Sequence, residues 1–198
     1  LKVLQSHPRS NGKFGTSGHS RGGTNSFFLA DVKLTSKFLG GTKGFDAILP
    51  EAAECRMAGF FAEPELTSNT TLLVVHGGAD DYTLAKFCKE HAERIKAPPG
   101  KVKIDIKEGW YHNWHAGKKP WREKMAMTVH ECPDFYVDNE GRFTNPTWVE
   151  WMVNKHKKYP SVEAFYETAQ TDPRKAWKTA FKIMKKEKCI SKGVTIGG

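Results

Sequence analysis

The hydrophobic positions of this chain predict strands and helices in alternation over its first half. Residues 71–75 form a nearly continuous apolar run of the kind found in buried parallel strands. Residues 102–106 alternate between apolar and charged side chains, which is typical of a half-buried strand. Together with two weaker runs, the pattern indicates four strands, near residues 13–17, 56–61, 71–75 and 102–107.

Two stretches between these strands have the periodicity of helices. Residues 24–34 carry apolar side chains at helical spacing after a polar start, and residues 84–95 do the same before the breaker at Pro98 and Pro99. Strands that alternate with helices favour an α/β fold, with helices flanking a mostly parallel sheet.

The pattern changes after residue 115. Residues 132–143 predict a short hairpin that turns at residues 139–141, and two helices are predicted over residues 147–158 and 162–188. Ser161 is a typical helix start, and so is Pro173 at a first helical position.

We therefore divide the chain into two parts. Residues 1–115 form the α/β core, and residues 116–198 form a basic, mostly helical extension packed on that core. The extension carries 16 Lys and Arg against 10 Asp and Glu, out of a net charge of +9 for the chain. Its lysines follow an amphipathic pattern near the C-terminus, so we interpret them as a solvated helix face.

Composition and charge limit the classes of binding partner that we expect for this chain. A content of 38% hydrophobic and 12% aromatic residues is typical of a globular domain. The basic excess is not accompanied by a nucleic-acid-binding motif, so we expect no nucleic-acid partner. The longest aliphatic run is residues 72–75, far short of a bilayer crossing, so we expect no membrane partner. The sequence does not assign a compartment.

The segment GHSRGG at residues 18–23 matches the nucleophile elbow, a tight turn from strand to helix that presents a serine. Glycines flank the serine because side chains there would clash in such a turn. The match alone is weak, since it is short and its residues are common. Its position between a predicted strand and a predicted helix favours Ser20 as a nucleophile.

An acid and a histidine follow the next two strands. The run at 71–75 leads into HGGADDYT, which contains Asp80, and the strand at 102–107 leads into GWYHNW, which contains His112. Serine, acid and histidine in this order is the arrangement of α/β-hydrolases. Each residue follows a strand, at the edge of an open parallel sheet where ligands bind.

In these three motifs the chain resembles the dienelactone hydrolase-like family of α/β-hydrolases, over about residues 13–115. The resemblance implies that Ser20 is the nucleophile, Asp80 the orienting acid and His112 the general base. It implies hydrolysis of a small-molecule ester through an acyl-enzyme intermediate, with no cofactor. Dienelactone hydrolase itself uses cysteine as the nucleophile, so a serine here is more like the general carboxylesterases of the family.

Two neighbouring residues compete for these roles. Asp81 is the alternative acid, although we favour Asp80 and expect Asp81 to cap the following helix. His115 is the alternative base, although we favour His112 and expect His115 at the surface or the pocket rim.

An oxyanion hole and a substrate pocket complete the predicted site. The backbone N–H of Arg21, directly after the nucleophile, is expected to donate to the oxyanion. A possible acyl or aryl pocket is lined by residues close to the triad, namely His19, Trp110, Tyr111 and Trp114.

The four cysteines are widely spaced and contain no zinc-binding pattern, so we predict isolated thiols, with a disulfide at Cys132 as the alternative. A metal site can be drawn from His112 and His115 with a third residue, which is His76, His91 or Cys88. The triad already accounts for His112, so we predict no metal.

Only 19 residues precede Ser20, fewer than the strands and helices that normally come first in this fold. We therefore expect the N-terminal strands to be missing, and either self-association or a missing segment to cover the exposed sheet edge. Two other functions stay open. One is a prolyl-oligopeptidase-like serine peptidase, and the other is a truncated, non-catalytic interaction module.

Overall fold

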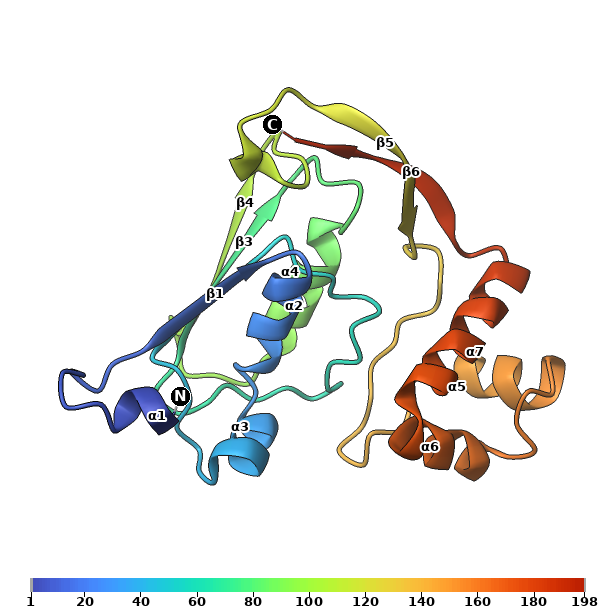
Figure 1. Ribbon diagram of the computed structural model, residues 1–198, viewed down its shortest axis with the longest axis horizontal. Coiled ribbons are helices and arrows are strands. Elements are labelled where there is room, and N and C mark those ends of the chain that lie inside the picture. The colour runs from blue at the N-terminus through green and yellow to red at the C-terminus, as the bar shows by residue number, and fades with distance from the viewer. Residues whose placement is uncertain (1, 198) are drawn as a thin grey trace.

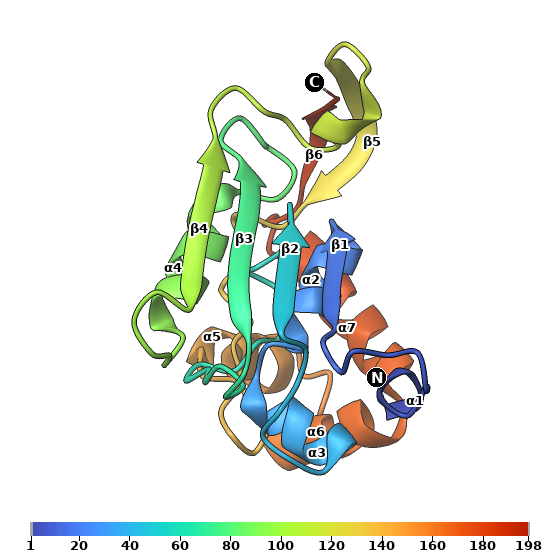
Figure 2. The same cartoon turned by 90° about the vertical axis from the view of Figure 1, so that its left-hand side faces the viewer.

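A four-stranded parallel sheet forms the centre of the first half of the chain. The structure is a computed structural model that describes residues 2–197. The strands lie in sequence order across the sheet, each hydrogen-bonded to the next (Figure 2). They are β1 (Gly15–His19), β2 (Ala47–Glu51), β3 (Thr71–Gly77) and β4 (Val102–Lys107). The expected α/β arrangement is therefore confirmed at this level.

Helices cover one face of this sheet. Helix α2 (Arg21–Phe28) packs on β1 and β2, and α4 (Ala85–Arg94) packs on β3 and β4. Figure 2 shows the strands in front and these helices behind them. On the opposite face, Leu73 is 37% exposed. The sheet thus has a helix-covered face and an open face.

The second strand differs from the prediction. Residues 56–61 do not form a strand of this sheet, and β2 lies at 47–51 instead. Pro50 obscured it, because proline lacks an N–H and is rare in a central strand. The first strand also begins two residues later than expected, at Gly15.

The helix predicted over residues 24–34 is in fact two helices. Helix α2 ends at Phe28, and α3 (Val32–Leu39) begins after a short turn. The Asp31 carboxylate accepts a hydrogen bond of 2.8 Å from the Lys33 N–H and so caps α3. The apolar periodicity continues across this turn, which is why the pattern predicted one helix. A further short helix, α1 (Lys2–Gln5), precedes β1.

The extension contains strands as well as helices, so its description as mostly helical was incomplete. Strands β5 and β6 pair antiparallel and form a two-stranded arm above the helices (Figure 1). The elements after the core are η1 (Trp114–Ala116), β5 (Trp121–Thr128), α5 (Pro146–Val149), the π-helical segment η2 (Glu150–Lys155), α6 (Val162–Thr171), α7 (Pro173–Lys186) and β6 (Ser191–Ile196).

Within the extension, the local signals located the helix starts. The Ser161 side chain accepts a hydrogen bond from the Ala164 N–H and caps α6, and Pro173 is the first residue of α7. A turn at residues 138–141 joins Val137 and Phe143 in an antiparallel bridge, which confirms the predicted short hairpin.

The extension is joined to the core by hydrogen bonds and packing. The Tyr136 hydroxyl donates to the Cys55 carbonyl at 3.0 Å, and Arg94 lies over the Tyr136 ring at 3.9 Å. The Val137 N–H donates to the Phe60 carbonyl at 3.0 Å. The two parts thus share an interface at residues that follow β2 and at α4.

All four cysteines form disulfides, so the prediction of isolated thiols was wrong. Cys55 is bonded to Cys88, and Cys132 to Cys189. The partners are 33 and 57 residues apart in sequence, and only the tertiary fold brings them together. Disulfides that close loops of this kind typically contribute roughly 2–4 kcal/mol to stability.

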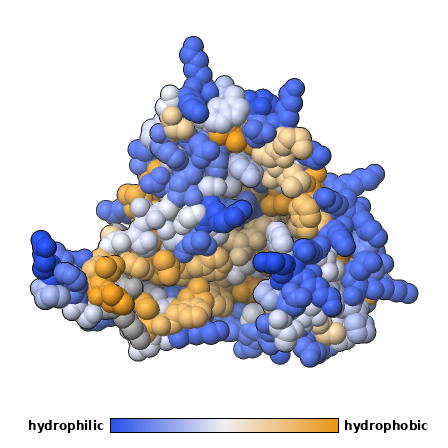
Figure 3. Space-filling view, in the orientation of Figure 1, coloured by the Kyte–Doolittle hydropathy of each residue, from blue (hydrophilic) through white to orange (hydrophobic). Residues whose placement is uncertain are grey.

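An apolar groove lies between α2 and α3. It has a volume of about 410 Å³ and is lined by Phe28, Leu34, Phe38 and Phe45 among others. In Figure 3 hydrophobic colour gathers at the lower left, over the region of α1 and α3. Strand β1 pairs only with β2 among residues 2–197. Self-association at the edge of β1, or a missing segment that covers this edge, stays a prediction.

In residues 2–197 no helix combines the length and the apolar character needed to cross a membrane.

A histidine without charge is built into the core. His91, on α4, is 3% exposed and stacks on Phe60 with ring centroids 4.3 Å apart. Burial, and to a lesser degree the charge of Arg94, lowers the pKa of His91 to about 3. The native state therefore excludes the proton that an unfolded chain would bind at mildly acidic pH.

We expect His91 to weaken the fold in acid. An unfolded histidine has a pKa of about 6.5, so between that pH and about 3 the unfolded state binds more protons, and stability falls by about 1.4 kcal/mol per pH unit. His91→Phe should keep the stacking and remove roughly 2 kcal/mol of the loss between pH 7 and pH 5. Urea unfolding of both proteins at the two pH values measures this, and equal losses would contradict it.

Candidate active site

Ser20 lies in a strained turn between β1 and α2. Its backbone has φ of 56° and ψ of −117°, which is an uncommon conformation for a residue with a side chain. Its N–H donates to the Glu51 carbonyl at 2.8 Å, which fixes the turn against β2. The turn therefore has the shape that the elbow motif predicts.

Two glycines allow this turn to close. A Cβ atom at Gly18 would overlap the backbone of Gly22, and one at Gly23 would overlap the carbonyl oxygen of Glu51. At Gly22 itself a Cβ atom would meet nothing within 4 Å. The close approach thus depends on Gly18 and Gly23, whereas the sequence motif is read at Gly18 and Gly22.

The structure brings Ser20, His112 and Asp80 together in one chain of hydrogen bonds. The Ser20 Oγ lies 3.0 Å from His112 Nε2, and Asp80 Oδ2 lies 2.8 Å from His112 Nδ1. His112 and Asp80 are each 2% exposed, and Ser20 is half-buried. The three residues follow β1, β4 and β3, so the carboxyl ends of parallel strands place them at one edge of the sheet.

The Asp80 carboxylate is held by its own loop. Oδ1 accepts hydrogen bonds of 2.9 Å from the Tyr82 and Thr83 N–H groups, and the Thr83 hydroxyl lies 2.9 Å from Oδ2. Burial raises the pKa of Asp80. This effect is outweighed by the hydrogen bond and charge of His112 and by the hydrogen bond from the Thr83 N–H, so the pKa lies below its ordinary value. Asp80 is therefore an anion at neutral pH.

Asp81 has a different role from the one expected. It does not cap α4; its Oδ1 accepts a hydrogen bond of 2.6 Å from the Thr195 N–H of β6. Its Oδ2 forms an ion pair of 2.8 Å with Arg122 of β5. Asp81 thus ties the β5–β6 arm to the loop that carries Asp80.

Residues near the C-terminus also contact His112. The sequence did not predict this contact. The Gly197 N–H donates to the His112 carbonyl at 2.6 Å, next to a parallel bridge between His112 and Ile196. The ring of Tyr82 meets the His112 ring edge-on at 4.8 Å. No local signal marks Gly197, because its partner lies 85 residues earlier in the chain.

The remaining predicted residues surround the triad unevenly. The His19 ring lies 5.0 Å from the His112 ring and 5.2 Å from Trp114, whose ring lies 5.3 Å from Trp110. Trp110 is 39% exposed, and Tyr111 is half-buried with no ring partner among the described residues. His115 is exposed and faces His19, so it is not bonded to Ser20 or Asp80.

His19 is uncharged at neutral pH. Burial, followed by the charges of His112 and His115, lowers the pKa of His19 to about 4. The uncharged His19 ring thus lies beside the triad together with the Trp114 and Trp110 rings.

Arg21 is the first residue of α2. The first N–H groups of a helix have no acceptor within the helix, so the Arg21 N–H next to Ser20 is left for another acceptor. This is the position expected for the first oxyanion donor.

Neither the family models nor the curated proteins compared with this chain give a match.

The two elbow glycines make a matched pair for testing the turn. We expect Gly23→Ala to destabilise the protein by about 1–3 kcal/mol, because the new methyl group would overlap the Glu51 carbonyl. Gly22→Ala, in open space on the same helix, should be neutral or stabilising by up to about 1 kcal/mol. Urea unfolding measures both, and equal effects would show that the turn is not closely packed.

Proposed function

We propose that the chain is a serine hydrolase that cleaves carboxylic esters through an acyl-enzyme intermediate. The observation that carries this proposal is the hydrogen-bonded chain from Ser20 through His112 to Asp80. Each hydrogen bond is within the range expected for a nucleophile, a base and an orienting acid. The four-stranded parallel sheet, with these residues after β1, β4 and β3, supports an α/β-hydrolase-type site.

In the first half of the reaction, His112 acts as the general base. With its Nδ1 proton held by Asp80, its Nε2 accepts the proton of Ser20 as Oγ attacks the ester carbonyl carbon. The Arg21 N–H stabilises the negative charge that develops on the carbonyl oxygen. The tetrahedral intermediate then collapses, and His112 returns the proton to the leaving alcohol.

The second half releases the acid. A water molecule gives a proton to His112 Nε2 and attacks the acyl carbon, and the proton returns to Ser20 Oγ as the carboxylic acid leaves. Asp80 stays ionised throughout and stabilises the imidazolium. Its lowered pKa is suited to this role, because an anion opposite the imidazolium is needed at neutral pH.

The resemblance to the dienelactone hydrolase-like family points to the same reaction class. The serine at the nucleophile position of this chain favours an activity like that of the carboxylesterases of that family. A prolyl-oligopeptidase-like peptidase uses the same order of groups, so hydrolysis of amides as well as esters would favour that activity instead.

Labelling with a fluorophosphonate tests the nucleophile. We expect one adduct per chain, on Ser20, because His112 activates that hydroxyl. The adduct should disappear in Ser20→Ala and persist in Ser17→Ala, which removes an exposed serine of β1. Intact mass and peptide mapping measure it. A folded chain that takes no label, or takes it elsewhere, would favour the interaction module.

The two neighbouring aspartates test the orienting acid. Asp80→Asn should lower kcat for an activated ester by about 10⁴-fold, because an amide favours the wrong tautomer of His112. Asp81→Asn is the matched control. It removes a contact to β6 and should cost less than about tenfold, since Asp81 does not reach the imidazole. Equal losses in the two variants would contradict the assignment of Asp80.

A further inference from the structure

Beside the triad, two potential ligands lie opposite each other on neighbouring strands. His19 is the last residue of β1 and Glu51 the last residue of β2, and they are paired in the parallel register. Paired residues of adjacent strands project from the same face of a sheet. The register thus holds an imidazole and a carboxylate together at the carboxyl edge.

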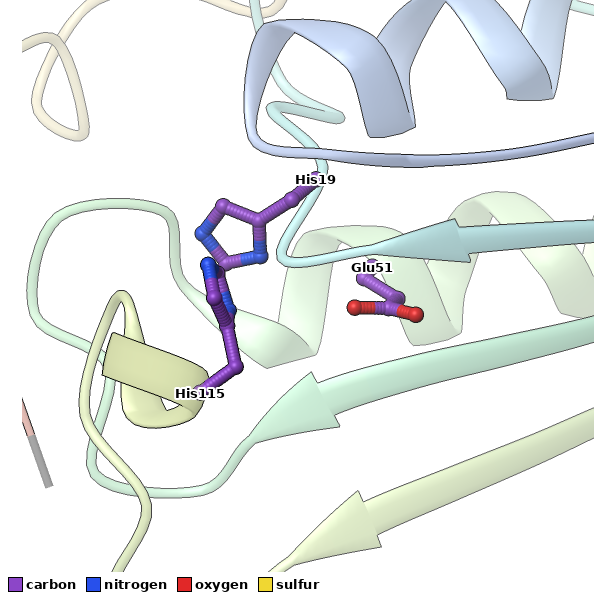
Figure 4. Close-up of side chains that lie close together, drawn as sticks. All are labelled: His19, Glu51 and His115. Atoms are coloured by element: carbon purple, nitrogen blue, oxygen red, sulfur yellow. The ribbon is translucent and has the colours of Figure 1, made fainter. Parts of the chain in front are cut away.

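A third ligand comes from the segment after β4. His115, in η1, faces His19 with ring centroids 4.4 Å apart. Figure 4 shows the two rings and the Glu51 carboxylate gathered around one space. One ligand atom from each residue lies within 4.8 Å of the others. No two of these three side chains are within hydrogen-bond or ion-pair distance of each other. Their potential ligand atoms therefore surround a space without bonding across it.

The His19 imidazole is unsatisfied within the described residues. Both ring nitrogens are buried and neither has a hydrogen-bond partner, although Asn113 approaches the ring. A buried polar group without a partner costs stability, and native structures rarely leave one without a reason. An ion bound in the space between the three residues would supply the missing partner of the imidazole.

We infer that His19, Glu51 and His115 bind a divalent transition-metal ion of the imidazole-preferring class, represented by Zn²⁺. Two imidazoles and one carboxylate suit zinc, whereas calcium and magnesium favour oxygen ligands alone. Three protein ligands leave a fourth tetrahedral position open to water or another small ligand.

The required movement is small. Ligands about 2.1 Å from a tetrahedral ion lie about 3.4 Å apart, so groups that lie within 4.8 Å of one another must close by up to about 1.4 Å. His115 is exposed and can rotate, while the strand register fixes the backbones of His19 and Glu51.

This site differs from the metal site considered from the sequence. That alternative used His112, which the structure engages with Ser20 and Asp80. The structure groups His115 with His19 and Glu51 instead. The prediction of no metal is therefore replaced here by this proposal, which does not depend on the proposed hydrolase activity.

A titration with Co²⁺ alone tests the site directly. The full-length Ser20→Ala protein is treated with a chelator, dialysed and titrated, and visible absorption of bound Co²⁺ is recorded. We expect one ion per chain, displaced by Zn²⁺. The Ser20→Ala background separates this result from the proposed function, because binding then needs no active nucleophile. The absence of stoichiometric binding would overturn the proposal.

Three variants in this background decide which residues bind the ion. Glu51→Gln and His115→Asn should each weaken binding at least tenfold, whereas His7→Asn, which removes a surface histidine in the N-terminal segment, should bind as the parent does. Circular dichroism shows whether each variant is folded, and a folded variant of either ligand suffices. Unchanged binding in either folded ligand variant, or an equal loss in His7→Asn, would overturn the three-residue site.

Discussion

The hydrogen bond between the Asp80 carboxylate and His112 is the contact on which the arrangement of the site depends. It joins the loop after β3 to the segment after β4, and it leaves Nε2 of the same ring free to meet Ser20. Both partners are almost fully buried, so the loss of either would leave the other with one hydrogen bond fewer in a place that water does not reach. The tight loop from Asp80 to Thr83 positions the carboxylate for this hydrogen bond, and the strained turn at Ser20 positions the serine next to the same imidazole.

The C-terminal extension is part of this support. Gly197, directly after β6, donates to the His112 carbonyl, and Thr195 of β6 donates to the Asp81 carboxylate. Two of the three loops that meet at the site therefore contact residues from the end of the described chain. The extension therefore supports the loops of the site and does not only pack on the core.

The sequence was informative where a local pattern carries the signal. Ser20, Asp80 and His112 each follow a strand, and parallel strands bring such residues to one edge, so their grouping could be predicted. Strand β2 could not, because Pro50 breaks the expected pattern of a central strand. The pairing of β5 with β6, the two disulfides and the contacts of Asp81 join residues 33 to 114 positions apart. No periodicity or motif encodes which distant residue will be the partner.

The Cys132–Cys189 disulfide closes a covalent ring around α5, η2, α6 and α7, and β5 and β6 enter and leave this ring close to its junction. The helices inside the ring can fray or be cut once by a protease without separating the two strands of the arm, because the bond still joins them. The arm that reaches His112 and Asp81 is in this way insulated from damage to the helices that it is connected to.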